Sequence, residues 1–357
     1  MALPATRREF LKTTAATTAA AAAVTCSGPL ILGADNKSSS KLPIVGSGAH
    51  TYECIHNWGE LPSQVTWGDT HGVAVDSAGL IYVKHRNAAK DPMDAIVVFD
   101  PAGKCVRTFG DEYNGFGHGI DLRQEGNEEF LYLSCIQKGI VTKTTLKGEI
   151  VWVLSKPREP GVYKDPAKKY SPTNVAFGAD GGFYIADGYG SHFIHQYDKD
   201  ANWVRTWGGQ GAEPGKMRTP HGIWLDNRPG REPTLVVADR ANARLQYFTL
   251  DGKHLSFVND VSFPAHFDIR GDILLVPDLH ARVTLLDKNN SVIAHLGYDE
   301  SWTKEVLADK MKMRTEPHRW QSGRFIHPHD ACFDSGGNIF VVEWVPTGRV
   351  TKLRKVS

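Results

Sequence analysis

The chain of 357 residues is about twice as long as a typical domain, so it holds one large domain or two ordinary ones. Hydrophobic residues make up 41% and charged residues 23%, which indicates a folded globular protein and excludes extensive disorder. The 41 basic and 40 acidic side chains leave a net charge of +1, so we expect no basic face for nucleic acid.

The first 34 residues have the features of an export signal. Arg7 and Arg8 precede Phe-Leu-Lys and a weakly apolar stretch, rich in Ala and Thr, that extends to Leu32. This order is typical of twin-arginine signals, with a frayed basic helix as the alternative, and the threonines argue against stable membrane insertion. We therefore expect a cleaved signal (1–34), a linker (35–44) and a mature protein in the periplasm or outside the cell.

One sequence pattern recurs six times after the linker. Each copy has a turn with His-Gly or Pro, an alternating strand, a Gly/Asp turn, an apolar strand ending in Asp or Arg, and further strand segments. The copies cover residues 70–110, 117–154, 171–208, 219–252, 263–297 and 327–355. Four-stranded units of about 40 to 50 residues are the signature of β-propeller blades.

The sixth copy stops after its third strand, whereas residues 51–59 resemble an isolated fourth strand. The sequence therefore predicts an all-β, six-bladed β-propeller over residues 45–357, closed by an N-terminal strand that completes the last blade and removes an open edge. The copies resemble NHL repeats. Insertions at 155–170 and 298–326 lie between blades, and the second carries a short helix around 304–312, so both can overhang one mouth of the channel.

Histidines recur at the start of the innermost strand of several blades. Equivalent residues of different blades converge on the channel axis, and converging neutral imidazoles are a common ligand set for zinc. Three histidine ligands leave a fourth position for water or substrate, which indicates a catalytic site. A turn preference, with each ring packed on the next blade, is the alternative. The histidines at this position are His71, His118, His221 and His329. His266 of the fifth copy is an additional candidate.

The second strands of the blades end in further functional groups. Arg86, Tyr189 and Arg240 are not required by the turns there, and we expect them near the same mouth as the histidines. Two guanidinium groups and a phenol beside a metal suggest a substrate with a carboxylate and a phenolate that acts as base. Surface arginines paired with nearby aspartates are the alternative. His280 follows another such strand and has no assigned role.

These motifs resemble those of the peptidyl-α-hydroxyglycine α-amidating lyases, and the resemblance spans all six blades. It rests on GHGI, PHGI and PHDA around three of the histidines, KHRN and ADRANAR around the arginines, and ADGYGS around the tyrosine. The resemblance implies a six-bladed propeller with catalytic zinc and structural calcium. The residues it implies are His118, His221 and His329 for zinc, Asp330 with the carbonyls of Val73 and Ile120 for calcium, and Tyr189, Arg240 and Arg86 for catalysis.

The sequence also departs from this family. The disulfides of the animal enzymes have no counterpart, and His71 and His266 are extra histidines that could alter the metal site. We expect an exported, monomeric, zinc-dependent lyase that cleaves a carbinolamide C–N bond in a small or peptidyl substrate with a carboxylate. The alternatives are another metal-dependent propeller enzyme, such as a lactonase or sugar lyase, and a non-enzymatic NHL binding module of the cell envelope.

Overall fold

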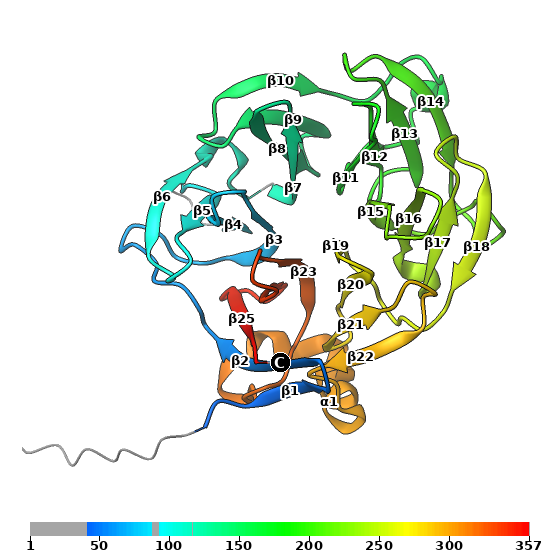
Figure 1. Cartoon of the computed structure of the whole chain (residues 1–357). Helices are drawn as coiled ribbons and strands as arrows, with labels where there is room; N and C mark the ends of the chain where they lie inside the picture. Colours follow the sequence, from blue (N-terminus) through cyan, green and yellow to red (C-terminus); the bar gives the residue numbers. More distant parts are fainter. Residues whose placement is uncertain (1–40, 88–92, 116, 357) are drawn as a thin grey trace, which may run out of the picture. The chain divides into compact units, whose positions relative to one another are not determined.

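The repeated units fold into antiparallel sheets that follow one another around a ring (Figure 1). The computed structural model describes residues 41–87, 93–115 and 117–356. The ring belongs to the unit that begins at Leu42. Its six sheets form a six-bladed β-propeller, as the sequence predicts.

The first three blades take their four strands from consecutive segments of the chain. Blade one contains β3 (Asp69–Val75), β4 (Ile81–Arg86), β5 (Ile96–Phe99) and β6 (Cys105–Phe109). Blade two contains β7 (Gly117–Glu125), β8 (Glu128–Cys135), β9 (Ile140–Thr145) and β10 (Ile150–Leu154). Blade three contains β11 (Val175–Phe177), β12 (Phe183–Ala186), β13 (Phe193–Tyr197) and β14 (Trp203–Gly208).

The last three blades repeat this arrangement until the ring closes. Blade four contains β15 (Pro220–Asp226), β16 (Thr234–Asp239), β17 (Arg244–Phe248) and β18 (His254–Val258). Blade five contains β19 (Asp268–Arg270), β20 (Ile273–Asp278), β21 (Arg282–Leu286) and β22 (Val292–Leu296). Blade six contains β23 (Pro328–Phe333), β24 (Ile339–Glu343) and β25 (Arg349–Lys355), followed in the sheet by β2 (His50–His56) and β1 (Ile44–Ser47).

The predicted closure of the ring is confirmed. Strand β2 pairs antiparallel with β25, so that Cys54 lies opposite Leu353, and the N-terminal segment completes the last blade. Strand β1 adds a fifth strand that the sequence did not predict. The N-terminal and C-terminal strands are thus hydrogen-bonded in one sheet, which closes the ring.

The hydrophobic core lies between neighbouring blades. Tyr82 and Val98 of blade one, for example, pack with Leu131 and Leu133 of blade two, and all four are buried. Five further clusters of this kind join the other blades in turn. Because the middle strands are covered on both faces, their apolar runs are continuous, as in Ile96–Phe99.

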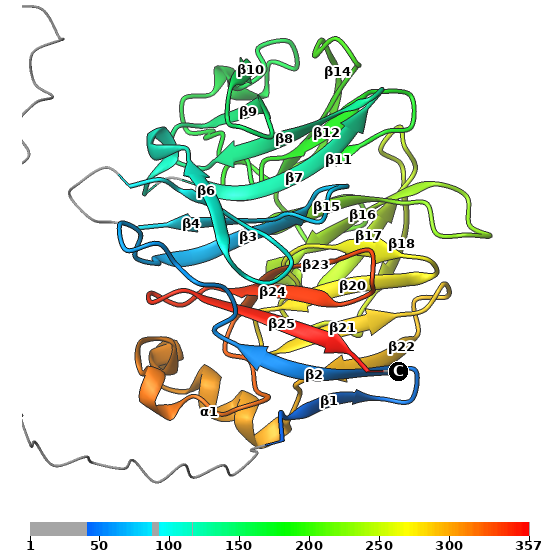
Figure 2. The same cartoon turned by 60° about the vertical axis from the view of Figure 1, so that its left-hand side comes forward.

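Both predicted insertions lie between blades. The one at 298–326 contains the predicted helix, which begins earlier than expected because the Asp299 side chain caps it by accepting a hydrogen bond from the Trp302 N–H at 2.9 Å. The helical segments of the insertions are η2 (Val162–Lys164), α1 (Glu300–Met311), η4 (Lys312–Thr315) and η5 (Pro317–Arg319). Figure 2 shows α1 at one end of the strands of blades five and six.

The predicted signal (1–34) and the linker up to residue 40 lie outside the described residues, so both stay predictions. In the part of the chain that the structure describes, no helix is long and apolar enough to cross a bilayer. The four cysteines of that part are free thiols: Cys54, Cys105, Cys135 and Cys332.

Candidate metal centre and active site

Irregularities in four innermost strands coincide with the histidines. The pairing register of β3, β7, β15 and β23 shifts at His71, His118, His221 and His329, respectively. Such β-bulges re-aim a side chain and are frequent next to active sites. The ligand atoms of the last three histidines lie within 4.8 Å of one another, and all three residues are buried.

The glycine that follows a histidine has a specific role. A side chain at Gly119 would come within 2.4 Å of the Thr173 carbonyl oxygen of the next blade. The same carbonyl lies 3.1 Å from Nδ1 of His118. At His221, Nδ1 lies 2.7 Å from the Ala265 carbonyl oxygen, again on the next blade. The His-Gly pair therefore lets the neighbouring backbone approach and fix the ring, so packing on the next blade and metal binding are compatible.

The protonation of these rings favours a bound cation. Burial, followed by the charges of Arg240 and of neighbouring histidines, holds the pKa of His221 well below its ordinary value, and burial likewise lowers the pKa of His118 and His329. The rings are therefore neutral, and each Nδ1 that faces a carbonyl carries the proton, because a carbonyl oxygen can only accept.

The other ring nitrogens then face each other as lone pairs. Nε2 of His118 lies 2.9 Å from Nε2 of His221. Two acceptors at this distance repel unless a cation lies between them. Nδ1 of His329 likewise faces the His71 carbonyl at 2.7 Å, which leaves its Nε2 free to bind a metal. Three neutral imidazoles fit the ligand preference of zinc.

The two additional histidines lie outside this group of three. His71 is next to it, with its ring centre 4.7 Å from that of His329 and its Nδ1 2.9 Å from the Asp69 carbonyl oxygen of its own strand, but it is not one of the three residues whose ligand atoms lie within 4.8 Å of one another. His266 is directed elsewhere, because its Nε2 lies 2.9 Å from Oδ1 of Asp121. The structure thus brings together the three histidines that carry the family motifs.

Tyr189 lies against the histidine group. Its hydroxyl lies 3.1 Å from Nε2 of His221 and accepts a hydrogen bond of 2.9 Å from Nη1 of Arg240. Arg240 is 4% exposed, and its Nε donates to the Pro264 carbonyl. Its Nη2 is buried without a protein partner. A buried guanidinium N–H without an acceptor is costly, which indicates that a ligand oxygen belongs there.

Arg86 completes the predicted set from another blade. Its Nη2 lies 3.0 Å from Oδ2 of Asp69, whose Oδ1 accepts from Nη2 of Arg314 at 2.8 Å. Arg86 thus pairs with an aspartate, as the alternative interpretation expects, and also lines the cavity beside the histidines. That cavity has a volume of about 430 Å³. Its lining combines charged and apolar side chains: His71, Arg86, His118, Ile136, Tyr189, Thr219, Arg240, Phe263, Leu279, His280, Met311, His329 and Trp344.

A second cavity, of about 230 Å³, is lined by the three predicted calcium-binding residues Asp330, Val73 and Ile120. Asp121 and Asp268 line it too. Burial raises the pKa of Asp330 to about 7 and that of Asp268 to about 6. Several carboxylates in one buried cavity fit a hard divalent cation.

The sequence analysis missed Asp121 and Asp268, two carboxylates that line this second cavity. Asp121 forms the ion pair with His266, and despite burial the charges of Asp330 and Asp121 raise the pKa of His266 to about 9. An imidazolium therefore already offsets part of the negative charge. The Val73 N–H donates to Oδ2 of Asp330 at 3.0 Å, which fixes the carboxylate against blade one.

Comparisons with known proteins agree with the motifs. No model of a known protein family matches the chain. The peptidyl-glycine alpha-amidating monooxygenase of Mus musculus is 26% identical over 226 residues, 56% of this chain and 22% of that protein. The peptidyl-alpha-hydroxyglycine alpha-amidating lyase 1 of Drosophila melanogaster is 25% identical over 301 residues, 78% of this chain and 51% of that protein. The chain is a distant homologue of the peptidylglycine alpha-amidating enzymes.

Solved structures of other proteins share the fold of this chain. The streptogramin B lyase structure has a TM-score of 0.54 and 11% identity over 84% of this chain and 97% of that one. The virginiamycin B lyase from Staphylococcus aureus has a TM-score of 0.54 and 14% identity over 85% of this chain and 100% of that one. At these identities the likeness shows a common propeller architecture.

Proposed function

We propose that the protein is a zinc-dependent lyase that cleaves the carbinolamide C–N bond of an N-acyl-α-hydroxyglycine and releases an amide and glyoxylate. The observation that carries this proposal is the 2.9 Å contact between two unprotonated histidine nitrogens, with the Tyr189 hydroxyl 3.1 Å from one of them. Distant homology to amidating enzymes, the lyase included, supports the same reaction class.

A zinc ion held by His118, His221 and His329 would polarise the substrate hydroxyl and make it more acidic. Tyr189 would take the hydroxyl proton, and the electron pair would form the carbonyl of glyoxylate as the C–N bond breaks. The same phenol would return the proton to the departing amide nitrogen. Tyr189 is 43% exposed and lines the cavity.

The two arginines would bind the substrate carboxylate. Nη2 of Arg240 has no partner among the described residues, and Arg86 lies in the same cavity on a different blade. Two guanidinium groups around one carboxylate would fix the orientation of the reacting carbon relative to Tyr189.

Calcium on Asp330 and the carbonyls of Val73 and Ile120 would join blades one, two and six below the histidines. In the same proposal, the twin-arginine motif directs the protein to the periplasm or the outside of the cell, and the enzyme works as a monomer.

The proposal is tested on full-length protein purified without added metal. We expect stoichiometric zinc by elemental analysis, and turnover of α-hydroxyhippurate to benzamide and glyoxylate that a chelator abolishes and zinc restores. Hydrolysis of lactones without turnover of α-hydroxyhippurate would contradict the lyase and favour a lactonase. Absence of bound metal and of any turnover would favour a binding module.

A further inference from the structure

We propose that the inserted segment 298–326 restricts the active site to short N-acyl-α-hydroxyglycines with an apolar acyl group and excludes extended peptides. This inference rests on the proposed lyase function and specifies its substrate class.

The size and lining of the cavity limit the substrate. Its volume of about 430 Å³ lies near the lower end of the range of about 300–1,000 Å³ in which proteins enclose small ligands. The apolar part of its wall consists of Ile136, Phe263, Leu279, Met311 and Trp344. Such a cavity suits a molecule with a carboxylate at one end and an apolar group at the other.

The inserted segment contributes Met311 to this wall through an unusual backbone. The φ angles of Asp309, Lys310 and Met311 are +48°, +57° and +63°. Three successive non-glycine residues in the left-handed region are unfavourable, and they persist only where the surrounding structure determines them. The strained turn ends the helical part of α1 and places Met311 at the cavity.

The segment is anchored on both sides of this turn. Nη2 of Arg314 donates to Asp69 on blade one at 2.8 Å, and its guanidinium lies 3.5 Å from the ring centre of Trp344 on blade six. Trp302 is buried, and its indole N–H donates to the Phe325 carbonyl at 2.7 Å. The segment therefore leaves blade five, contacts blade one and returns to blade six as a fixed wall.

The Asp69 carboxylate that anchors the inserted segment also contacts Arg86, which we propose to bind the substrate carboxylate. Asp69 accepts from Arg314 through Oδ1 and from Arg86 through Oδ2. One carboxylate therefore holds both Arg86 and the inserted segment that carries Met311.

Binding of inert analogues tests the inference independently of turnover. Hippurate and N-benzoyl-Ala-Ala-Gly both lack the reacting hydroxyl, and calorimetry measures their dissociation constants with the zinc-loaded protein. We expect hippurate to bind at least about tenfold more tightly, because the longer molecule meets the wall. Equal affinities, or no measurable binding of hippurate, would overturn the inference.

A matched pair of variants locates the restriction. Met311→Gly suits the positive φ angle and removes the side chain from the wall, so the difference between the two analogues should shrink to within about threefold. Asp309→Gly relieves the same kind of backbone strain at an exposed residue outside the cavity lining, and the difference should persist. Loss of selectivity in Asp309→Gly alone would contradict a role for Met311.

Turnover separates this inference from the proposed function. The comparison uses kcat/KM for α-hydroxyhippurate and for N-benzoyl-Ala-Ala-α-hydroxyglycine. Similar values for both would leave the lyase intact and overturn the size restriction. Turnover of neither, with selective binding of hippurate, would reject the lyase and leave the restriction in place.

Discussion

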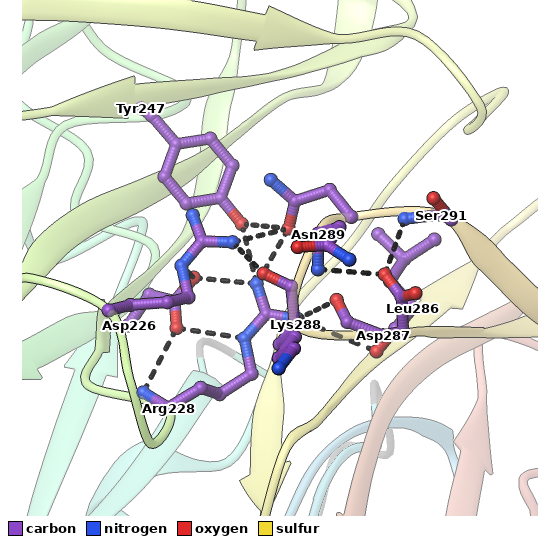
Figure 3. Close-up of polar contacts among 10 residues, drawn as sticks. Asp226, Arg228, Tyr247, Leu286, Asp287, Lys288, Asn289 and Ser291 are labelled. Atoms are coloured by element: carbon purple, nitrogen blue, oxygen red, sulfur yellow. Dashed lines mark hydrogen bonds and ion pairs between the residues drawn. The ribbon is translucent and has the colours of Figure 1, made fainter.

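Two buried polar clusters in this propeller use similar side chains in different ways. In the first, Arg228 is 1% exposed and its guanidinium donates to Asp226 at 2.9 and 2.7 Å, to Asn290 at 2.6 Å and to the Asp287 carbonyl at 2.5 Å (Figure 3). In the second, Arg240 is 4% exposed, yet its Nη2 has no protein partner.

The difference distinguishes a structural cluster from the cluster that we propose to bind a metal and a substrate. Around Arg228, the donors are matched by acceptors on blades four and five, so the cluster joins those blades without external help. Around His118 and His221, unprotonated nitrogens face each other, and the nearby Arg240 has an unused donor. A surplus of lone pairs and of N–H groups in one cavity is the combination that a metal and an anionic substrate would satisfy.

The largest expected effect is on kcat and concerns Tyr189, in the second cluster, around Arg240. Tyr189→Phe removes the proposed base but keeps the ring, so kcat should fall by about 10²–10⁴-fold while zinc content and folding persist. Steady-state kinetics with α-hydroxyhippurate and elemental analysis of the same preparation measure both quantities. Unchanged kcat would show that Tyr189 is not the base.

The histidine group was predictable from the sequence because it follows the repeat. Equivalent positions in different blades meet at the axis, so His71, His118, His221 and His329 could be placed together once the blades were aligned, and the family resemblance selected the last three. The β-bulges that aim these side chains occur at the His-Gly and Pro-His pairs of four of the six copies.

Contacts outside the repeat were not predictable. The pair of Asp121 and His266 joins blades two and five, and nothing in the spacing of 145 residues indicates it. The path of the inserted segment to Asp69 follows from packing specific to this chain. Arg228 stands in Asn-Arg-Pro-Gly-Arg, which resembles an exposed turn, but Asp226 and the β21–β22 turn bury it.

Breaking the first cluster should cost stability and leave the chemistry intact. Arg228→Ala leaves the Asp226 carboxylate buried without its main partner, and the free energy of unfolding should fall by about 3–5 kcal/mol. Urea unfolding measures this loss, and kcat of the folded variant on α-hydroxyhippurate should match the wild type. A loss below about 1 kcal/mol would mean that the cluster behaves like an exposed ion pair.

Removing a proposed zinc ligand should weaken metal binding and leave the fold intact, whereas Arg228→Ala should lower stability and leave the chemistry intact. His221→Ala should weaken zinc binding by more than about a hundredfold, because loss of an outer-shell contact alone costs about 10–100-fold. Titration with a competing chelator measures the affinity, and the far-UV circular dichroism spectrum should stay unchanged. Retention of stoichiometric, tightly bound zinc would contradict the ligand set and make His71 the better candidate.

Acid should weaken the first cluster through Asp226. Burial alone would raise the pKa of Asp226, but the hydrogen bonds and charge of Arg228 hold it below its ordinary value. The unfolded chain, with a carboxyl pKa of about 3.9, then binds the proton first as the pH falls, so stability is lost from about pH 4 downward. Urea unfolding at several pH values should show a flatter acid slope in Asp226→Asn; parallel slopes would exclude this contribution.

The smallest effect gives the sharpest contrast, because the same change is made in both clusters. The Tyr247 hydroxyl lies 2.9 Å from Oδ1 of Asn290 and 3.2 Å from Nη2 of Arg228, as the Tyr189 hydroxyl lies beside Arg240. Tyr247→Phe should lower the free energy of unfolding by about 0.5–1.5 kcal/mol and leave kcat unchanged. Tyr189→Phe should do the reverse, since Tyr189 is half-exposed and its hydroxyl contacts His221 and Arg240, which we propose to bind the metal and the substrate. If both variants lost stability and kept full turnover, the distinction between the two clusters would fail.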